Sequence, residues 1–225
     1  MESKSIDVVT DFIARRTMMV DTQVRPSDVT KFPIIEAMLS IQREYFVPAS
    51  QREVSYMDGN VSLGEGRVLL EPRTFAKMLD ALDIGIDELV LDVGSGFGYS
   101  SSVIAHMAQA VVALEEDDKM AHEAQEVLTA VGADNVITHF GPLVMGAAEL
   151  GPYDVIIVQG GVEIIPMSLT DQLKDGGRMV CLFMDGVVGE ARIGYKLGGC
   201  FSWRRAFNAS APVLNGFERI RSFQL

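Results

Sequence analysis

The sequence contains few cysteine, tryptophan and histidine residues: two, one and three among 225. Cys181 and Cys200 lie in apolar segments without Cys-x-x-Cys spacing, so we expect two reduced core thiols and no disulfide. His106, His122 and His139 are isolated along the chain. Because their spacing is not that of a metal site, the sequence predicts that the protein binds no metal.

Long apolar runs and basic residues are also scarce. No segment approaches the roughly 18 consecutive apolar residues of a membrane-spanning helix, and the first residues lack the pattern of a signal peptide. We therefore expect a cytoplasmic protein with no membrane partner. Lysine and arginine number 19 against 31 acidic residues, a net charge of −12. This balance argues against a nucleic-acid partner, because phosphate contacts need a basic surface.

The most informative stretch, residues 88–105, has the pattern of a strand, a glycine turn and a helix. Residues 89–93 form a short run of mostly branched apolar side chains, which is typical of a buried parallel strand. The turn at 94–98 carries three glycines, and a helical pattern resumes at Tyr99. Glycine in the turn lets a ligand approach the main chain, and the helix start offers unpaired N–H groups. The stretch therefore predicts a ligand site.

The spacing of the glycines indicates which ligand binds. Dinucleotide sites follow Gly-x-Gly-x-x-Gly, whereas here the third glycine comes one residue early and an acidic residue precedes the turn. Asp/Glu-x-Gly-x-Gly-x-Gly resembles motif I of the Rossmann-like methyltransferases that use S-adenosylmethionine (SAM). The resemblance implies that SAM binds at Asp92, Gly94, Ser95, Gly96 and Gly98. A dinucleotide site and a plain turn without a ligand are the alternatives.

A second acidic position follows the next expected strand, residues 111–114. Glu115 lies about 20 residues beyond the glycine turn, where such folds bind ribose hydroxyls. The acidic run continues to Asp118, and acidic groups also suit the start of a helix. We expect both roles together, so that Glu115 binds the cofactor while Asp117 and Asp118 cap the helix.

The rest of the chain alternates between helical and strand patterns, which predicts a parallel sheet with right-handed crossovers. The chain ends in a run of strand patterns, of which two can pair as a hairpin. Helices are expected at 5–19, from near Ser27 or Thr30, at 72–82 and at 119–131. Further strands are expected at 135–140, 153–159, up to Phe183, in a hairpin of 186–197 with 200–207, and at 218–223.

Three motifs near the start of the chain are similar to those that open the protein-L-isoaspartate O-methyltransferases. Those enzymes typically show M-V-D-x-Q-I-R, then V-P-R-E-x-F-V-P, then A-Y-x-D. The matching segments are Met19-Val-Asp-Thr-Gln-Val-Arg25, Ile41-Gln-Arg-Glu-Tyr-Phe-Val-Pro48 and Tyr56-Met-Asp58. From the residues alone, Arg43 and Glu44 would be solvated charges at a helix end.

The resemblance covers nearly the whole chain and implies the fold. The predicted fold class is α/β, a Rossmann-like class I methyltransferase. Its sheet is mostly parallel and seven-stranded, with helices on both faces and an N-terminal helical extension. We expect residues 1–75 to form that extension with a substrate-side loop, and residues 76–225 to form the SAM-binding domain.

The substrate-side loop departs from the family pattern. Where the family has G-x-G-Q-T-I-S-Q-P, this chain has Gly-Glu-Gly-Arg-Val-Leu-Leu-Glu-Pro at 64–72. Arg67, Val68, Leu70 and Glu71 therefore replace two glutamines and two hydroxyl residues. We expect these four residues to form the substrate lip, which Val68 and Leu70 make apolar by pointing into the pocket or plugging it. Buried substrate groups that lose a hydrogen-bond partner would cost about 1–3 kcal/mol each.

A second departure lies after the third strand of the expected sheet. The family has a Gly-Asp-Gly turn there, whose aspartate reaches the adenine. This chain has Gly141-Pro142-Leu143 instead. We expect backbone groups of Gly141 and Leu143 to contact the base.

The resemblance also implies the reaction. A methyl group of SAM would pass to a carboxylate of damaged aspartyl residues in a protein or peptide, leaving S-adenosylhomocysteine, as a step of protein repair. A carboxyl group with a pKa near 4 is ionised at neutral pH, so no general base is needed. Two alternatives stand beside this prediction. One is a methyltransferase of a different, less polar substrate, and the other is a catalytically weak or inactive SAM-binding homologue that acts by interaction.

Overall fold

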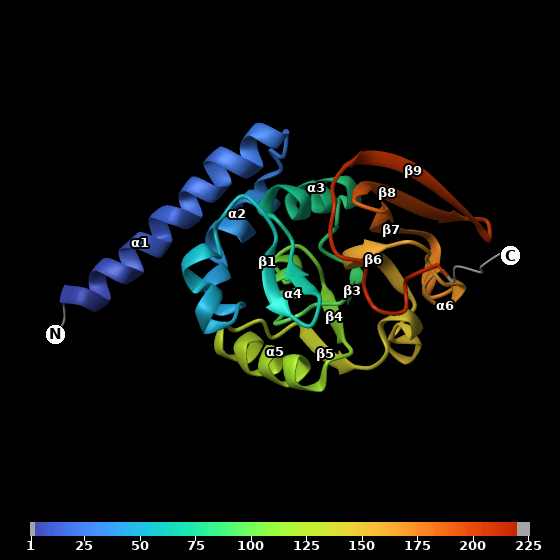
Figure 1. Ribbon diagram of the computed structural model, residues 1–225. Coiled ribbons are helices and arrows are strands. Elements are labelled where there is room, and N and C mark those ends of the chain that lie inside the picture. Colours follow the sequence, from blue (N-terminus) through green and yellow to red (C-terminus); the bar gives the residue numbers. More distant parts are fainter. Residues whose placement is uncertain (1–2, 220–225) are drawn as a thin grey trace, which may run out of the picture.

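A seven-stranded sheet forms the centre of the molecule (Figure 1). The computed structural model describes the backbone of residues 3–219 and the side chains of residues 11–219. The order of the strands is β5-β4-β3-β6-β7-β8-β9. They are β3 Leu89–Val93, β4 Ala110–Glu115, β5 Val136–Phe140, β6 Tyr153–Val162, β7 Leu173–Asp185, β8 Val188–Leu197 and β9 Cys200–Asn208.

The strands from β5 to β7 are parallel, and β8 and β9 extend the sheet antiparallel. The strand order reverses at β3, which has β4 on one side and β6 on the other. In an open parallel sheet, ligands bind outside the carboxyl ends of the strands at such a reversal. The predicted fold class is confirmed, and the glycine turn after β3 lies at this point.

Helices cover both faces of the sheet, unequally. Apolar side chains of α3, α4 and α5 pack on one face, while the other is covered by the short α6, two 3-10 turns and residues 213–217. None of the described helices is long and apolar enough to cross a membrane. The helices are α1 Ser3–Met19, α2 Phe32–Ser40, α3 Pro72–Leu82, α4 Tyr99–Ala105, α5 Asp118–Ala130 and α6 Met167–Thr170.

The N-terminal part joins the sheet through a common core. Helix α1 projects from the body (Figure 1) and continues into a short π-helix, Val20–Val24. Met19 and Val24 belong to the same buried cluster as Val90 of β3 and Val155 of β6. The division at residue 75 stays a prediction, because the two parts share this cluster.

A small hairpin stands apart from the main sheet. β1 (Val61–Gly64) and β2 (Arg67–Leu69) pair antiparallel as a separate two-stranded sheet. The sequence indicated a loop at this place. The turn between the strands consists of Gly64, Glu65 and Gly66, which all have positive φ angles of 99°, 48° and 74°. Glycine at both ends makes this tight turn possible, and it brings Arg67 back over the body of the protein.

Three expectations from the sequence need correction. Helix α2 begins at Phe32 with Lys31 at its N-cap, so neither Ser27 nor Thr30 caps it, because Asp28 is left-handed with φ 65° and Pro33 fits the first helical turn. Glu218 and Arg219 are outside any strand, and residues 220–223 of the expected last strand lie outside the described residues. Cys200 is exposed rather than in the core.

The two thiols should differ sharply in reactivity. Cys181 is fully buried in β7, and burial raises the pKa of its thiol well above the ordinary value. Cys200 begins the outer strand β9 and is exposed. Since the thiolate is the reactive form, a thiol reagent should modify one cysteine in the native protein and two after denaturation. Native modification of both would contradict the placement of Cys181, and a Cys200→Ser variant that still reacts before denaturation would do the same.

Candidate functional site

The glycine turn after β3 is held by the neighbouring strand. Gly94, Gly96 and Gly98 have φ angles of 77°, 58° and 92°, a region that side chains disfavour. The backbone N–H groups of Gly94 and Ser95 donate to the carbonyl of Leu114 at 2.8 and 3.1 Å. This attachment to β4 fixes the turn directly beside the residue that follows Leu114.

That residue, Glu115, ends β4 with a carboxylate that is 1% exposed. The backbone N–H of Gly96 donates to its Oε2 at 2.8 Å. The N–H groups of Glu116 and Asp117 donate to Oε1 at 2.9 and 3.2 Å. The structure thus brings the acidic residue and the glycine turn together, as the sequence predicts. Asp117 also caps α5 by accepting from the N–H of Met120 at 2.8 Å.

Arg67 of the hairpin completes the surroundings of Glu115. Its Nη1 and Nη2 donate to Oε1 and Oε2 of the carboxylate at 2.6 and 2.9 Å. The pair is nearly buried, with side-chain exposures of 8% and 1%. A Cβ on Gly94 would lie 2.8 Å from Nη2 of Arg67 and 3.5 Å from Cδ1 of Leu214. Arg67 and Leu214 therefore cover the first glycine of the turn.

Asp92 lies beneath the turn and is occupied by internal partners. The hydroxyls of Ser100 and Ser101 each donate to its Oδ2 at 2.6 Å, and Nε2 of Gln159 donates to Oδ1 at 2.7 Å. Burial raises the pKa of Asp92, and the three hydrogen bonds oppose that change. The carboxylate ties the end of β3 to α4 and β6. Asp92 is fully buried and supports the turn through these contacts, and its predicted role in cofactor binding stays a prediction.

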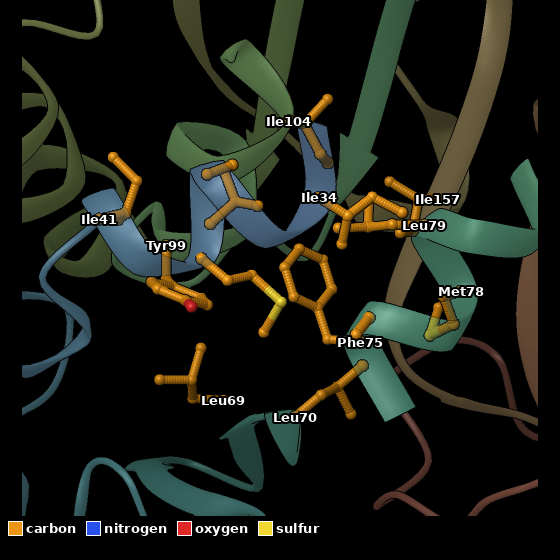
Figure 2. Packing of buried hydrophobic residues seen from close by; sticks show 14 of the residues in the cluster. Ile34, Ile41, Leu69, Leu70, Phe75, Met78, Leu79, Tyr99, Ile104 and Ile157 are labelled. Carbon is orange, nitrogen blue, oxygen red and sulfur yellow. The ribbon is translucent and has the colours of Figure 1, made fainter. Parts of the chain in front are cut away.

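The four lip residues separate in the structure. Arg67 reaches the turn, whereas Leu70 is 2% exposed and packs beside Phe75 in the core (Figure 2). Val68 is half-buried against the same cluster. Glu71 precedes α3 and accepts hydrogen bonds from Arg73 and Thr74. The expectation that Leu70 points into the pocket does not match its place in the core.

A groove of about 720 Å³ opens beside Arg67 and the turn after β5. Gly141 lines it, as expected for a backbone contact to a base, while the side chain of Leu143 is fully buried in the core under the sheet. The groove carries three acidic side chains and one arginine. Its lining residues are Glu65, Arg67, Glu116, Asp117, Phe140, Gly141, Pro142 and Asn215.

The sequence did not indicate the contribution of the C-terminal segment. Residues 209–217 cross the end of β6, where the N–H of Leu214 donates to the carbonyl of Gly161 at 2.9 Å. A Cβ on Gly160 would lie 2.6 Å from Leu214. The consecutive glycines at 160 and 161 could have predicted this contact, because glycine within a strand often marks the close approach of another backbone segment.

A buried polar cluster anchors the lip from below. Arg43 is fully buried, and it donates from Nε to the carbonyl of Ser55 and from Nη2 to that of Leu70, both at 2.6 Å. Its guanidinium lies 4.8 Å from the ring centre of Tyr99. The expectation from the residues alone, solvated charges at a helix end, is wrong for Arg43 and for Glu44, which is buried and accepts from the hydroxyl of Tyr56. Arg43 instead fixes the backbone of the segment that leads from β2 to α3.

The donor set matches the cofactor that the glycine spacing implies. Gly94 and Gly96 have no side chains of their own to block the backbone of the left-handed turn, and Glu115 supplies a carboxylate at the ribose position of such folds. The hydroxyl of Ser95 is buried without a partner among the described residues. The same carboxylate is, however, already held by Arg67. These residues fit SAM, and their roles in binding it stay a prediction.

Known proteins share both the sequence and the fold. A Syntrophus aciditrophicus protein-L-isoaspartate O-methyltransferase is 37% identical over 75% of this chain and 78% of the relative. A solved protein-L-isoaspartate O-methyltransferase superposes with a TM-score of 0.77 at 24% identity, covering 89% of this chain and 66% of that one. A Plasmodium falciparum protein assigned to the same activity was solved with S-adenosyl-L-homocysteine. It superposes with a TM-score of 0.76 at 19% identity, covering 89% of this chain and 98% of that one.

The two structures establish the fold, and the sequence matches establish the family. The family model for protein-L-isoaspartate(D-aspartate) O-methyltransferase matches residues 15–185, which include the hairpin, the glycine turn and Glu115. The predictions of family, fold class and enzyme class are confirmed. This chain belongs to the protein-L-isoaspartate(D-aspartate) O-methyltransferase family.

Proposed function

We propose that the chain is a SAM-dependent O-methyltransferase that methylates a carboxylate of isoaspartyl residues in proteins or peptides. The observation that carries the proposal is the contact between Glu115 and the glycine turn. The carboxylate and the backbone of Gly96 are joined at 2.8 Å at the point where the strand order reverses. Family membership supplies the reaction class, and these residues supply the place for it.

In this proposal, residues of the chain bind the cofactor and orient the reactants. Gly94 and Gly96 would allow close approach to the backbone, and Glu115 would accept from ribose hydroxyls in place of its bonds to Arg67. Gly141 lines the groove proposed for the base. SAM, when bound, supplies an electrophilic methyl group on a sulfonium. The accepting carboxylate is ionised at neutral pH, so the protein has no proton to remove. Alignment and exclusion of water, which can supply several kcal/mol, are then the main contributions.

A second candidate is a methyltransferase with a less polar acceptor. A cavity of about 340 Å³ lies on the other side of the hairpin turn. Its lining combines four apolar side chains with four charged ones: Pro48, Leu63, Phe97 and Met120 with Glu65, Asp117, Lys119 and Glu123. The hydroxyls that the family carries at positions 68 and 70 are absent here. A site built to bond a polar substrate discriminates through such groups, so their loss favours an acceptor that does not need them.

Incubation with methyl-labelled SAM and an isoaspartyl peptide tests the proposed function. We expect base-labile label on that peptide and none on the matched aspartyl peptide. The rate should be low, since Val68 cannot supply the hydrogen bond of the hydroxyl that the family carries there, and one missing transition-state hydrogen bond costs roughly 10²–10³ in rate. Label on neither peptide, with an active family enzyme labelling the isoaspartyl one, would contradict isoaspartyl methylation. It would leave the less polar acceptor and the interaction role as the remaining hypotheses.

A further inference from the structure

We propose that Arg67 is a gate on the cofactor site, and that it sets the affinity of this chain for its cofactor. In the closed form, the guanidinium takes the place of the ribose hydroxyls on Glu115. The cofactor binds when Arg67 leaves. This inference rests on the proposed function, because it assumes that Glu115 is the ribose ligand.

Glu115 has no acceptor to spare in the closed form. Its two oxygens accept five hydrogen bonds, two from Arg67 and three from backbone N–H groups. A carboxylate offers about four lone-pair sites. The backbone donors belong to the fold, so the two from Arg67 are the exchangeable ones. A ribose diol also presents two neighbouring donors and can take their place one for one.

The hairpin also covers the turn sterically. Nη2 of Arg67 lies 2.8 Å from the position of a Cβ on Gly94, and Cδ1 of Leu63 lies 2.8 Å from that on Gly96. Both residues come from the hairpin, Leu63 from β1 and Arg67 from β2. The hairpin therefore provides the closest contact over each of the two glycines, and Leu214 adds a looser contact over Gly94, 3.5 Å from the Cβ position. A single displacement of the hairpin removes the closest contact over both glycines.

The hairpin is built so that its tip can move. It forms its own two-stranded sheet, so displacing it breaks no ladder hydrogen bond of the seven-stranded sheet. At the tip, a Cβ on Gly64 or Gly66 would meet no atom of the described residues within 4 Å. The base of the hairpin is fixed, since Asn60 accepts from the N–H of Glu71 at 2.9 Å. Motion is thereby directed to the end that carries Arg67.

In the closed form, one hydrogen-bond donor of Arg67 has no acceptor. Nε of Arg67 is buried and has no hydrogen-bond partner among the described residues. A buried donor without a partner weakens the state that contains it. The side chain therefore holds Glu115 through its fork while one of its own groups is unsatisfied. This unpaired donor favours an ion pair between Arg67 and Glu115 that breaks when a ligand competes for Glu115.

Calorimetric titration of the full chain with S-adenosylhomocysteine tests the gate. Arg67→Gln removes the charged fork and keeps a polar side chain. When less than a tenth of the molecules are open, removing the closed form tightens binding by about tenfold or more. We expect that gain for Arg67→Gln over the wild type. The matched control is Arg73→Gln, an exposed arginine six positions along that contacts Glu71 and should leave affinity unchanged.

Each outcome decides between the gate and the proposed function. Equal and measurable binding by the wild type and Arg67→Gln overturns the gate and leaves the function standing. No binding by either protein overturns both. If circular dichroism shows that Arg67→Gln is unfolded, Arg67→Lys replaces it, because a lysine keeps the charge without the bidentate fork. A folded Arg67→Lys that binds no tighter than the wild type likewise overturns the gate.

Discussion

Replacing Glu115 with alanine is expected to lower the free energy of unfolding by about 3–5 kcal/mol, the usual cost of breaking a buried ion pair from one side. The change leaves the guanidinium of Arg67 buried without its carboxylate, and it removes the acceptor of the Gly96 N–H. Urea unfolding followed by circular dichroism measures the loss directly.

A surface glutamate provides the control for this prediction. Glu126 lies on α5 with 71% of its side chain exposed, and Glu126→Ala should change stability by less than about 0.5 kcal/mol. The double variant Glu115→Leu with Arg67→Met should lose less than the sum of the two single changes, because the two side chains are in direct contact. Additive losses, or a loss below about 1 kcal/mol for Glu115→Ala, would mean that the pair does not hold the hairpin.

Arg43→Ala should cost the protein about 4 kcal/mol. The two carbonyls that Arg43 bonds, those of Ser55 and Leu70, lose their donor, at about 1–3 kcal/mol for each acceptor left unpaired. The change also empties the space beside the ring of Tyr99, and a buried cavity adds to the loss. The midpoint of urea unfolding measures the effect.

Arg52 is the matched control, since it is an exposed arginine of the neighbouring 3-10 helix Ala49–Val54. Arg52→Ala should leave the unfolding midpoint nearly unchanged. Arg43→Lys should fall between the wild type and Arg43→Ala, because a lysine keeps the charge but has a single donor atom in place of the fork. Equal midpoints for Arg43→Ala and Arg52→Ala would show that the buried cluster contributes nothing to stability.

The elements with strong local signals were predictable from the sequence. The strand at 89–93 and the helix at 72–82 have the predicted bounds. The strand is a run of branched apolar residues that ends at a glycine. The helix begins with a proline, which is followed by an amphipathic pattern. The contact of Glu115 with the glycine turn also followed from local order, because parallel strands end at one edge of the sheet.

The errors came from signals that compete within a few residues. Ser27 and Thr30 are good capping residues, yet Pro33 sets the start of α2. Cys200 lies among apolar residues, but its strand is at the edge of the sheet, and a sequence does not show which strand will be the edge.

The pair between Arg67 and Glu115 joins residues 48 positions apart. The sequence marked both residues, one as part of the lip and one as the ribose ligand. Their contact depends on a hairpin whose strands have only three and four residues, too short for an alternating pattern to stand out. The burial of Leu70 depends on the same hairpin. The sequence pattern could not show which distant residues this short hairpin brings together.

The segment at residues 209–217 has a consequence for where the chain can be shortened. Leu214 lies over Gly94 and Gly160 and belongs to the buried cluster on that face of the sheet. A chain cut after β9 would keep every strand of the seven-stranded sheet but would leave the glycine turn uncovered on that side. Small metabolites would then reach the turn more easily than they do in the full chain.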